Sequence, residues 1–405
     1  MKINQNYITY NINLIQYIEI KISLKNNTTY WVKVNNTLKR IAKIYFFILK
    51  EKGLLLKEKQ KKIRCLGLTR NNLQCKRKVE NSYCFQHKKK KINFIDLFCG
   101  AGGFSLGLKK AGLKHLYGVD SWNIASNTYR TNIGFNICED LERLNPFKLT
   151  KKVDLLVGSP PCQVFSSANR NNSNSNKKKD DSYLSFLKFL NFYNPKVFIL
   201  ENVIGLLSYK INNFKVIDIM LEKLSINFNV KVYKICCTNF GVVQKRKRVI
   251  IIGVNKKYGS FFPDLKTYPL SIKLRDLLLD KNEIPLSFFL SKKAIAGILR
   301  RKKKNISKGN GFGAQYIDIN GFCNTITSNY YKDGYSNLIK YSNNETQIRR
   351  LTEIELKKIQ GFPDEFFFSG SKTDRYIQIG NSVPPQLSYY LGKQVLDFLN
   401  KIGSN

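Results

Sequence analysis

The fold class is decided by the stretch Phe94-Ile95-Asp96-Leu97-Phe98-Cys99-Gly100-Ala101-Gly102-Gly103-Phe104-Ser105, in which a short apolar run passes into a glycine-rich turn. Glycines in such a turn let the backbone approach a ligand closely, and a helix that starts after it offers free N–H groups. Tight turns also need glycine for geometric reasons alone, and the match to a dinucleotide fingerprint is imperfect, which counts against NAD. The stretch predicts a strand, a ligand-binding turn and a helix.

Short apolar runs alternate with amphipathic stretches from this turn onward. Strand–helix alternation predicts an α/β fold, with a mostly parallel sheet and helices on both of its faces. Ligands of a doubly wound sheet bind at the carboxyl ends of its strands, where the glycine-rich turn lies. We expect strands at 94–98, 116–119, 153–157, 197–200 and 249–254, and helices at 182–192 and 214–224.

Three further residues near strand ends suit an adenosine group. Asp120 can accept hydrogen bonds from two ribose hydroxyls, Trp122 can stack on adenine, and Asp140 can accept from an adenine amino group. Taken singly, each of the three is also a common loop or packing residue.

The segment Gly158-Ser159-Pro160-Pro161-Cys162-Gln163 contains the most specific signal in the chain. Two prolines fix the backbone before Cys162, so this cysteine leaves the strand end in a defined direction. A thiol is a strong nucleophile once it is ionised. A free cysteine is more often buried and inert, but a Pro-Pro-Cys-Gln turn is a poor place to bury one. We therefore interpret Cys162 as a nucleophile.

Two more segments carry polar residues beside apolar strands. Glu201 follows the run 197–200, where a desolvated carboxyl group can stay protonated and donate to a ring nitrogen, or can simply cap a helix. Alternation along 244–248 predicts that Gln244, Arg246 and Arg248 point to one side of the backbone, with Lys245 and Lys247 on the other.

Together these residues resemble the cytosine-C5 DNA methyltransferase family, over roughly residues 92–254 and 349–390 and in the family's motif order. The 96–105 loop resembles the first motif, Pro160–Gln163 the catalytic motif, Glu201–Val203 the next, and Gln244-x-Arg246-x-Arg248 the one after it. Two C-terminal segments resemble the family's last two motifs. The first segment is Arg350-Leu351-Thr352 with Gln360-Gly361-Phe362-Pro363, and the second is Gln378-Ile379-Gly380-Asn381-Ser382-Val383-Pro384-Pro385.

The resemblance implies a Rossmann-like domain that uses S-adenosylmethionine to methylate C5 of a cytosine flipped out of duplex DNA. Cys162 would add to C6, Glu201 would hold and protonate N3, and Arg248 would bind O2 with support from Arg246. The cofactor site would comprise Asp96, Phe98, Gly100, Gly102, Gly103, Phe104, Asp120, Asp140, Pro160, Asn381 and Ser382. The DNA contacts would comprise Gln163, Ser166, Gln244, Thr325 and Thr327.

The resemblance to this family also divides the chain into parts. A catalytic and cofactor-binding domain would occupy 91–254, a smaller target-recognition domain 255–348, and motifs that return to the catalytic domain 349–405. A basic extension of unassigned role precedes them at 1–60. Apolar residues from Leu38 to Leu49 recur there at helical spacing and predict a helix.

Residues 61–90 are rich in cysteine and basic residues. Cys65, Cys75, Cys84 and His87 offer three thiolates and an imidazole, a ligand set suited to tetrahedral zinc. The interval is too small and polar to fold without such a staple. It resembles a small zinc module of three cysteines and one histidine; four unrelated residues in an arm are the alternative.

Composition limits the remaining possibilities. The 405 residues contain 69 Lys+Arg against 28 Asp+Glu, a net charge of +41, which favours a polyanionic partner such as double-stranded DNA. A coding sequence biased toward Lys, Asn and Ile is the other source of such an excess.

We expect no secretion signal, no membrane span, an intracellular reducing compartment and a monomer, with a cognate restriction endonuclease as a possible partner. Methylation of tRNA and DNA binding without catalysis are the competing functions.

Overall fold

The computed structural model describes residues 92–146, 152–161, 182–259, 262–263, 265–268, 272–309, 314–332, 336–341 and 347–402, and the backbone of five short strands before them. The chain divides into two compact units, Met1–Lys89 and Lys90–Asn405. No helix in the described ranges is long and apolar enough to cross a membrane.

In the first unit, β1 (Ile18–Ile22), β2 (Tyr30–Val34) and β3 (Thr37–Ile41) form an antiparallel sheet, and β4 (Ile63–Arg64) pairs with β5 (Lys78–Val79). The predicted helix from Leu38 is therefore wrong over its first residues. Thr37–Ile41 pairs with all five residues of β2, and this ladder overrides the helical spacing of the apolar side chains.

A seven-stranded sheet forms the centre of the second unit, in the order β13-β15-β10-β9-β6-β7-β8. The expected strands are present as β6 (Asn93–Leu97), β7 (Lys114–Asp120), β9 (Leu155–Gly158), β10 (Val197–Val203) and β15 (Lys247–Asn255). β8 (Asn136–Cys138) was expected only as a strand before Asp140, without bounds, and β13 (Phe228–Cys236) was not predicted. Only β15 runs against the others, since it is antiparallel to both β10 and β13. The prediction of a mostly parallel sheet is confirmed.

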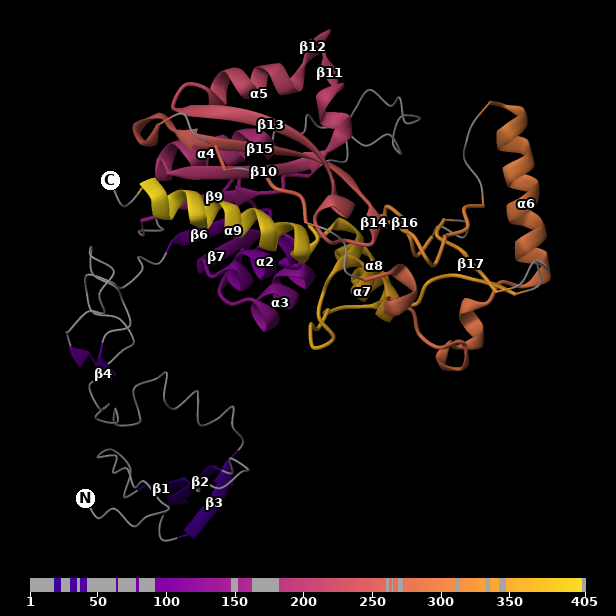
Figure 1. Ribbon diagram of the computed structural model, residues 1–405, viewed down its shortest axis with the longest axis horizontal. Coiled ribbons are helices and arrows are strands. Elements are labelled where there is room, and N and C mark those ends of the chain that lie inside the picture. The colour runs from indigo at the N-terminus through magenta and orange to yellow at the C-terminus, as the bar shows by residue number, and fades with distance from the viewer. Residues whose placement is uncertain are drawn as a thin grey trace. The chain divides into compact units, whose positions relative to one another are not determined.

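Helices cover both faces of this sheet (Figure 1), as predicted. On one face, α4 (Ser182–Tyr193) and α5 (Val216–Leu224) pack against the side chains that each strand directs to them. On the other face lie α2 (Gly103–Ala111) and α9 (Pro385–Ile402). Strand residues alternate between the two apolar clusters, as the pleat requires: Phe198 joins the first and Ile199 the second.

The C-terminal helix α9 returns to the start of the sheet and packs on α2. Glycines make the approach possible: a Cβ at Gly103 would lie 2.2 Å from Val383 O, and one at Gly107 would lie 2.2 Å from Pro385 O. Both of these contacted atoms are backbone oxygens at or just before the start of α9, so they cannot rotate away from the extra atom as a side chain can. The glycine-rich turn therefore serves packing as well as ligand approach.

Replacing Gly103 with alanine is expected to lower the free energy of unfolding by about 1–3 kcal/mol, the cost of overpacking a tight contact. Gly297 in helix α6 is the matched control, because a Cβ there would meet no atom within 4 Å. The Gly297→Ala change should instead raise stability by roughly 0.5–1 kcal/mol, since alanine favours helix. Urea unfolding of both variants measures the difference; equal effects would contradict the proposed contact.

The segment 255–348 follows the sheet, and its longest described element is α6 (Lys292–Ser307). It contains 3-10 turns at Lys256–Tyr258, Leu274–Leu277, Lys281–Glu283 and Leu286–Phe288, and short strands β16 (Cys323–Asn324) and β17 (Ile339–Lys340). A small apolar cluster of its own joins Ile295, Ala314, Leu338 and Ile348. After it come β18 (Ile348–Arg349), α7 (Glu353–Gln360) and α8 (Lys372–Asn381).

Candidate active site

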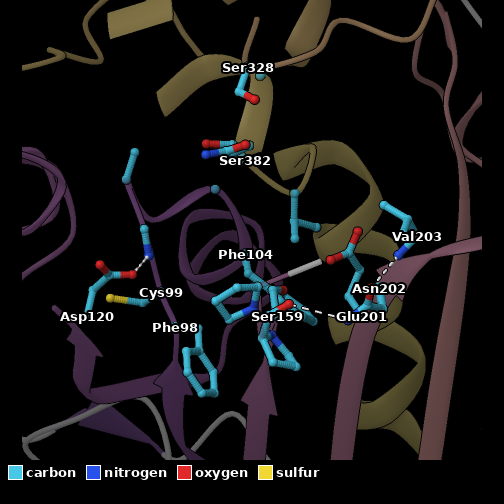
Figure 2. Close-up of a pocket in the computed structure, with 18 of the residues that line it drawn as sticks. Phe98, Cys99, Phe104, Asp120, Ser159, Glu201, Asn202, Val203, Ser328 and Ser382 are labelled. Atoms are coloured by element: carbon cyan, nitrogen blue, oxygen red, sulfur yellow. Dashed lines mark hydrogen bonds between the residues drawn. The ribbon is translucent and has the colours of Figure 1, made fainter. Parts of the chain in front are cut away.

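A cavity of about 1020 Å³ opens where the parallel strands β6, β7, β9 and β10 end. Its walls include the glycine-rich turn, the Ser159–Pro161 segment, the start of β15, residues Thr325–Ser328 and the Gly380–Val383 turn. Figure 2 shows Asp120 on one side of this cavity and Glu201 with Asn202 on the other, with Phe98 and Ser159 between them. The sheet thus brings together segments from most of the chain.

The glycine-rich turn has left-handed backbone conformations at Phe98 (φ 55°), Gly100 (φ 50°) and Gly102 (φ 97°). Such angles are strained for phenylalanine and ordinary for glycine. The turn is held by Asp120, whose Oδ2 accepts a hydrogen bond from Gly100 N at 2.8 Å and whose Oδ1 accepts one from Trp122 N at 2.8 Å. Burial raises the pKa of Asp120, and these two N–H donors oppose the rise.

Asp96 lies at the base of the same turn and is 1% exposed. Its Oδ2 accepts a hydrogen bond from Ser105 Oγ at 2.7 Å, Ser105 Oγ lies 2.6 Å from Tyr129 Oη, and Tyr129 Oη lies 2.8 Å from His115 Nε2. Burial raises the pKa of Asp96 to about 7, with a further contribution from the charge of Asp120. Burial and Lys109 lower the pKa of His115 to about 4.

The raised pKa of Asp96 predicts a pH-dependent stability. Because the folded state holds the proton more tightly than the unfolded chain, Asp96 stabilises the fold at low pH and this contribution is lost as pH rises to about 7. Between pH 5 and pH 8, the wild type should lose about 2–3 kcal/mol relative to Asp96→Asn in urea unfolding. The lowered pKa of His115 gives stability the opposite pH dependence, but both proteins retain His115, so its effect cancels in the difference between them. A pH-independent difference would contradict the assignment.

Glu201 and Arg248 form an ion pair within the cavity, with Arg248 Nε 2.8 Å from Glu201 Oε1. Both side chains are about 90% buried, and they come together because β10 and β15 are antiparallel, with Val203 opposite Arg248. Next to Glu201, Asn202 donates from Nδ2 to Pro160 O at 3.3 Å. This hydrogen bond connects the end of β10 to the proline segment that precedes Cys162.

The predicted alternation along 244–248 is confirmed: Gln244, Arg246 and Arg248 are buried, whereas Lys245 and Lys247 are exposed. Gln244, however, does not face DNA in this structure. It is fully buried, donates to Gln360 Oε1 at 2.8 Å and accepts from Ile326 N at 2.9 Å. Its predicted DNA contact is corrected to an internal one, because both ends of its amide are already hydrogen-bonded within the protein.

Arg246 has a similar internal position. Its guanidinium donates to three backbone carbonyls, those of Ile326 at 2.9 Å, Gly380 at 3.0 Å and Ser382 at 3.2 Å. These carbonyls belong to two different segments of the cavity wall, so Arg246 holds the two segments together. We therefore treat Arg246 as a positioning residue and not as a group that touches the reacting atoms.

Most predicted site residues lie on the cavity. The cofactor candidates that line it are Asp96, Phe98, Gly100, Gly103, Phe104, Asp120, Asp140, Pro160, Asn381 and Ser382; Gly102 instead caps α2. Thr325 and Thr327 also line it, and Thr325 Oγ1 donates to Lys245 O at 3.0 Å.

The sequence analysis assigned no role to Gln378 or Asn202, although both belong to the quoted motifs. The buried Gln378 Oε1 has no hydrogen-bond partner among described residues.

Several predicted residues lie outside the described residues. They are Cys162, Gln163 and Ser166 after the proline segment, and the zinc candidates Cys65, Cys75, Cys84 and His87. Within the described ranges no group of three or more His, Cys, Asp or Glu side chains is placed to hold a metal ion.

This sheet and its cavity define an α/β fold of the S-adenosylmethionine-dependent methyltransferase type. Residues 92–397 match the family of C-5 cytosine-specific DNA methylases, and the chain belongs to that family. It is similar to the Type II methyltransferase M.DsaV of Dactylococcopsis salina (31% identity, covering 77% of this chain and 88% of the relative). It is also similar to M.HpaII of Haemophilus parainfluenzae (31% identity, 78% and 92%). The protein is a cytosine-C5 DNA methyltransferase.

Solved structures agree on the fold. The S. pombe Dnmt2 methyltransferase has a TM-score of 0.61 at 19% identity, over 76% of this chain and 100% of its own. The Entamoeba histolytica methyltransferase EhMeth has a TM-score of 0.61 at 17% identity, over 77% and 99%.

The family's methyl donor, S-adenosylmethionine, fits the chemistry of the cavity. Asp96, Asp120, Glu139 and Asp140 gather on it, although the whole chain has only 28 acidic residues. Carboxylates suit a ligand that carries a sulfonium and an ammonium cation and ribose hydroxyls. Asp120 in particular is oriented by two backbone N–H groups, and each carboxylate oxygen can accept further hydrogen bonds.

Proposed function

We propose that this methyltransferase attacks C6 of a cytosine in a specific duplex DNA sequence with Cys162, and that Glu201 and Arg248 hold the base. The observation that carries the proposal is the buried Glu201–Arg248 ion pair on the same cavity as the glycine-rich turn. A duplex base can reach such a cavity only when it is flipped out of the stack.

The place of Pro161 supports the assignment of Cys162 as the attacking group, because Pro161 lines the cavity and directly precedes Cys162 in the chain. Addition of the thiolate to C6 moves electron density to C5, which then takes the methyl group. Bound S-adenosylmethionine supplies this group from an electrophilic sulfonium. Loss of the C5 proton to solvent, breakage of the C6–sulfur bond and return of the N3 proton to Glu201 release 5-methylcytosine and the Cys162 thiolate.

Glu201 and Arg248 would recognise the base together. Glu201 would contact N3 and deliver a proton there as C6 becomes saturated, while Arg248 would donate to O2. In the structure Arg248 uses Nε for Glu201 and Nη1 for Lys247 O at 2.8 Å, and a guanidinium has five N–H donors in total, so donors remain for O2. The ion pair would orient both groups before the base arrives.

The cofactor would be held by the glycine-rich turn, by Asp120 at the ribose, and by Asn381 and Ser382 from the turn before α9. We also propose that 255–348 selects the target sequence, with Thr325 and Thr327 near the DNA, and that Gln163 and Ser166 contact the flipped nucleotide. These assignments rest on the place of Thr325 and Thr327 in the cavity wall and on the family motifs.

Incubation with tritiated S-adenosylmethionine and mixed-sequence duplex DNA tests the proposal. We expect label in 5-methylcytosine, and bisulfite sequencing of a plasmid from an expressing host would identify the sequence context. Transfer to tRNA but not to DNA would contradict it. DNA binding without any transfer would also contradict it and would favour the non-catalytic alternative.

We further propose that Cys65, Cys75, Cys84 and His87 bind zinc. The pairing of β4 with β5 supports this, because it places Arg64 opposite Lys78, one residue from Cys65 and three from Cys75 along the chain. Metal analysis of the purified full chain should find about one zinc per chain, lost in Cys84→Ser and retained in Cys138→Ser. Zinc absent from the wild type would contradict this.

We also propose that the enzyme is a monomer, and the Type II names of the relatives lead us to propose that it serves beside a separate endonuclease. Light scattering of the purified protein checks the first point. Cleavage of unmethylated, but not methylated, host DNA by a nuclease from the same cells checks the second.

A further inference from the structure

Helix α6 (Lys292–Ser307) has a charge distribution that the fold does not require. Its sequence contains seven Lys and Arg residues and no Asp or Glu. One face carries Ile295, Ile298 and Leu299, which pack with the small apolar cluster of the recognition segment. Ser291 caps the helix by accepting from Ala294 N at 3.2 Å. These features account for the helix but not for its cations.

Three of the cations form a line on the opposite face, which we call the basic stripe: Lys293, Arg300 and Lys304. At 100° per residue they point within roughly 40° of one another and about 160° away from Ile295. All three are exposed, and no side-chain nitrogen of the three forms a hydrogen bond or ion pair with any residue described in the structure. By contrast, Lys302 lies 6.0 Å from the Tyr316 ring and belongs to the packed side.

Helix electrostatics do not explain the stripe. The helix dipole favours cations only in the last turn, and Lys293 lies in the first turn, where no acidic residue is present. Arg300 and Lys304 are four residues apart, a spacing at which like charges destabilise a helix by about 0.2–0.5 kcal/mol. An external anion would relieve this repulsion.

We propose that the basic stripe of α6 binds the phosphate backbone of duplex DNA and supplies sequence-independent affinity. The proposal rests on the proposed DNA substrate. The stripe spans about 16 Å of helix, and duplex DNA carries about one negative charge per 1.7 Å, so several phosphates can face it at once. Contacts to phosphates position a protein on DNA without reading bases. α6 (Figure 1) would thus anchor the recognition segment, while other residues choose the sequence.

The test compares two triple variants with equal net charge. The stripe variant is Lys293→Gln, Arg300→Gln and Lys304→Gln; the control is Lys110→Gln, Lys215→Gln and Lys393→Gln, three lysines that are equally exposed elsewhere on the same unit. Glutamine keeps helix propensity and removes the charge. The probe is a fluorescein-labelled mixed-sequence duplex, and its anisotropy is measured against NaCl concentration.

We expect the slope of log K against log[NaCl] to fall by about 2.7 in the stripe variant, since each phosphate contact contributes about 0.9. Affinity at about 0.15 M NaCl should fall on the order of a hundredfold. The control should keep the wild-type slope, and both variants should bind S-adenosylmethionine as the wild type does. Equal slopes in the two variants would overturn the proposal.

Methyl transfer by the wild type separates this result from the proposed function. If the wild type methylates DNA and the stripe variant keeps its salt slope, only the role of α6 fails. If the wild type transfers no methyl group, the proposed function itself fails. If the wild type methylates DNA and the stripe variant has the reduced salt slope, the stripe variant should also show a raised KM for DNA with little change in kcat.

Discussion

Replacement of Cys162 by alanine is expected to reduce methyl transfer by about three orders of magnitude or more, with the affinity for S-adenosylmethionine unchanged. The reason is chemical: C5 of cytosine becomes nucleophilic only after a nucleophile has added to C6, and alanine offers none. Cys162 is not itself among the residues assigned to the cofactor, and Pro160, the nearest of them along the chain, is unchanged in the variant.

Two measurements distinguish loss of the nucleophile from loss of the fold. Calorimetric titration with S-adenosylmethionine should give the same affinity for Cys162→Ala and wild type. A duplex with 5-fluorocytosine should form a denaturation-resistant complex with the wild type alone, since fluorine at C5 blocks the proton loss that precedes release. Cys138→Ala removes an exposed cysteine at the end of β8 and should retain full activity. Activity in Cys162→Ala would refute the nucleophile assignment.

The second large effect is expected at the ion pair between Arg349 and Glu355, both of which are 0% exposed. Arg349 Nη1 and Nη2 lie 2.8 Å from Glu355 Oε2 and Oε1. Glu355 also accepts from Thr352 N at 2.7 Å and from Leu279 N at 3.1 Å, which connects α7 to the segment 255–348. Removal of one partner leaves the other charge buried without compensation.

Glu355→Gln and Arg349→Met are each expected to lower the free energy of unfolding by about 3–5 kcal/mol. The double variant Arg349→Met with Glu355→Leu should lose much less than the sum, because no unpaired charge remains. Glu353→Gln is the control: it breaks a similar pair with Arg375 whose side chains are 28% and 30% exposed, and it should cost about 1 kcal/mol or less. Additive single effects would contradict the proposed coupling.

Local sequence patterns predicted much of the central sheet. The apolar runs that form β6, β9, β10 and β15 are short, uninterrupted and bounded by turns, so periodicity locates them well. β13 was missed although Phe228, Val230 and Val232 alternate with polar residues, because it contains no uninterrupted apolar run like those of the other strands. Its place is set by nine paired residues of β15, which come later in the chain. Cross-strand hydrogen bonds of this kind leave no local pattern.

The candidate site likewise has features that the sequence predicted and features that only the tertiary structure decides. Residue identity and motif order predicted the family, the Gly100–Gly103 turn, Glu201 and Arg248 as candidate site residues, and the side to which Gln244 and Arg246 point. The sequence did not predict that β15 runs against β10, and this direction together with the strand register brings Arg248 Nε to 2.8 Å from Glu201 Oε1.

Tertiary structure also decided that Gln244 and Arg246 face inward to backbone and side-chain partners, and that Val383 O closes on Gly103. The physical reason is common to these cases. A side chain's identity and local direction depend on its neighbours in sequence, whereas its partner depends on which distant segment packs there.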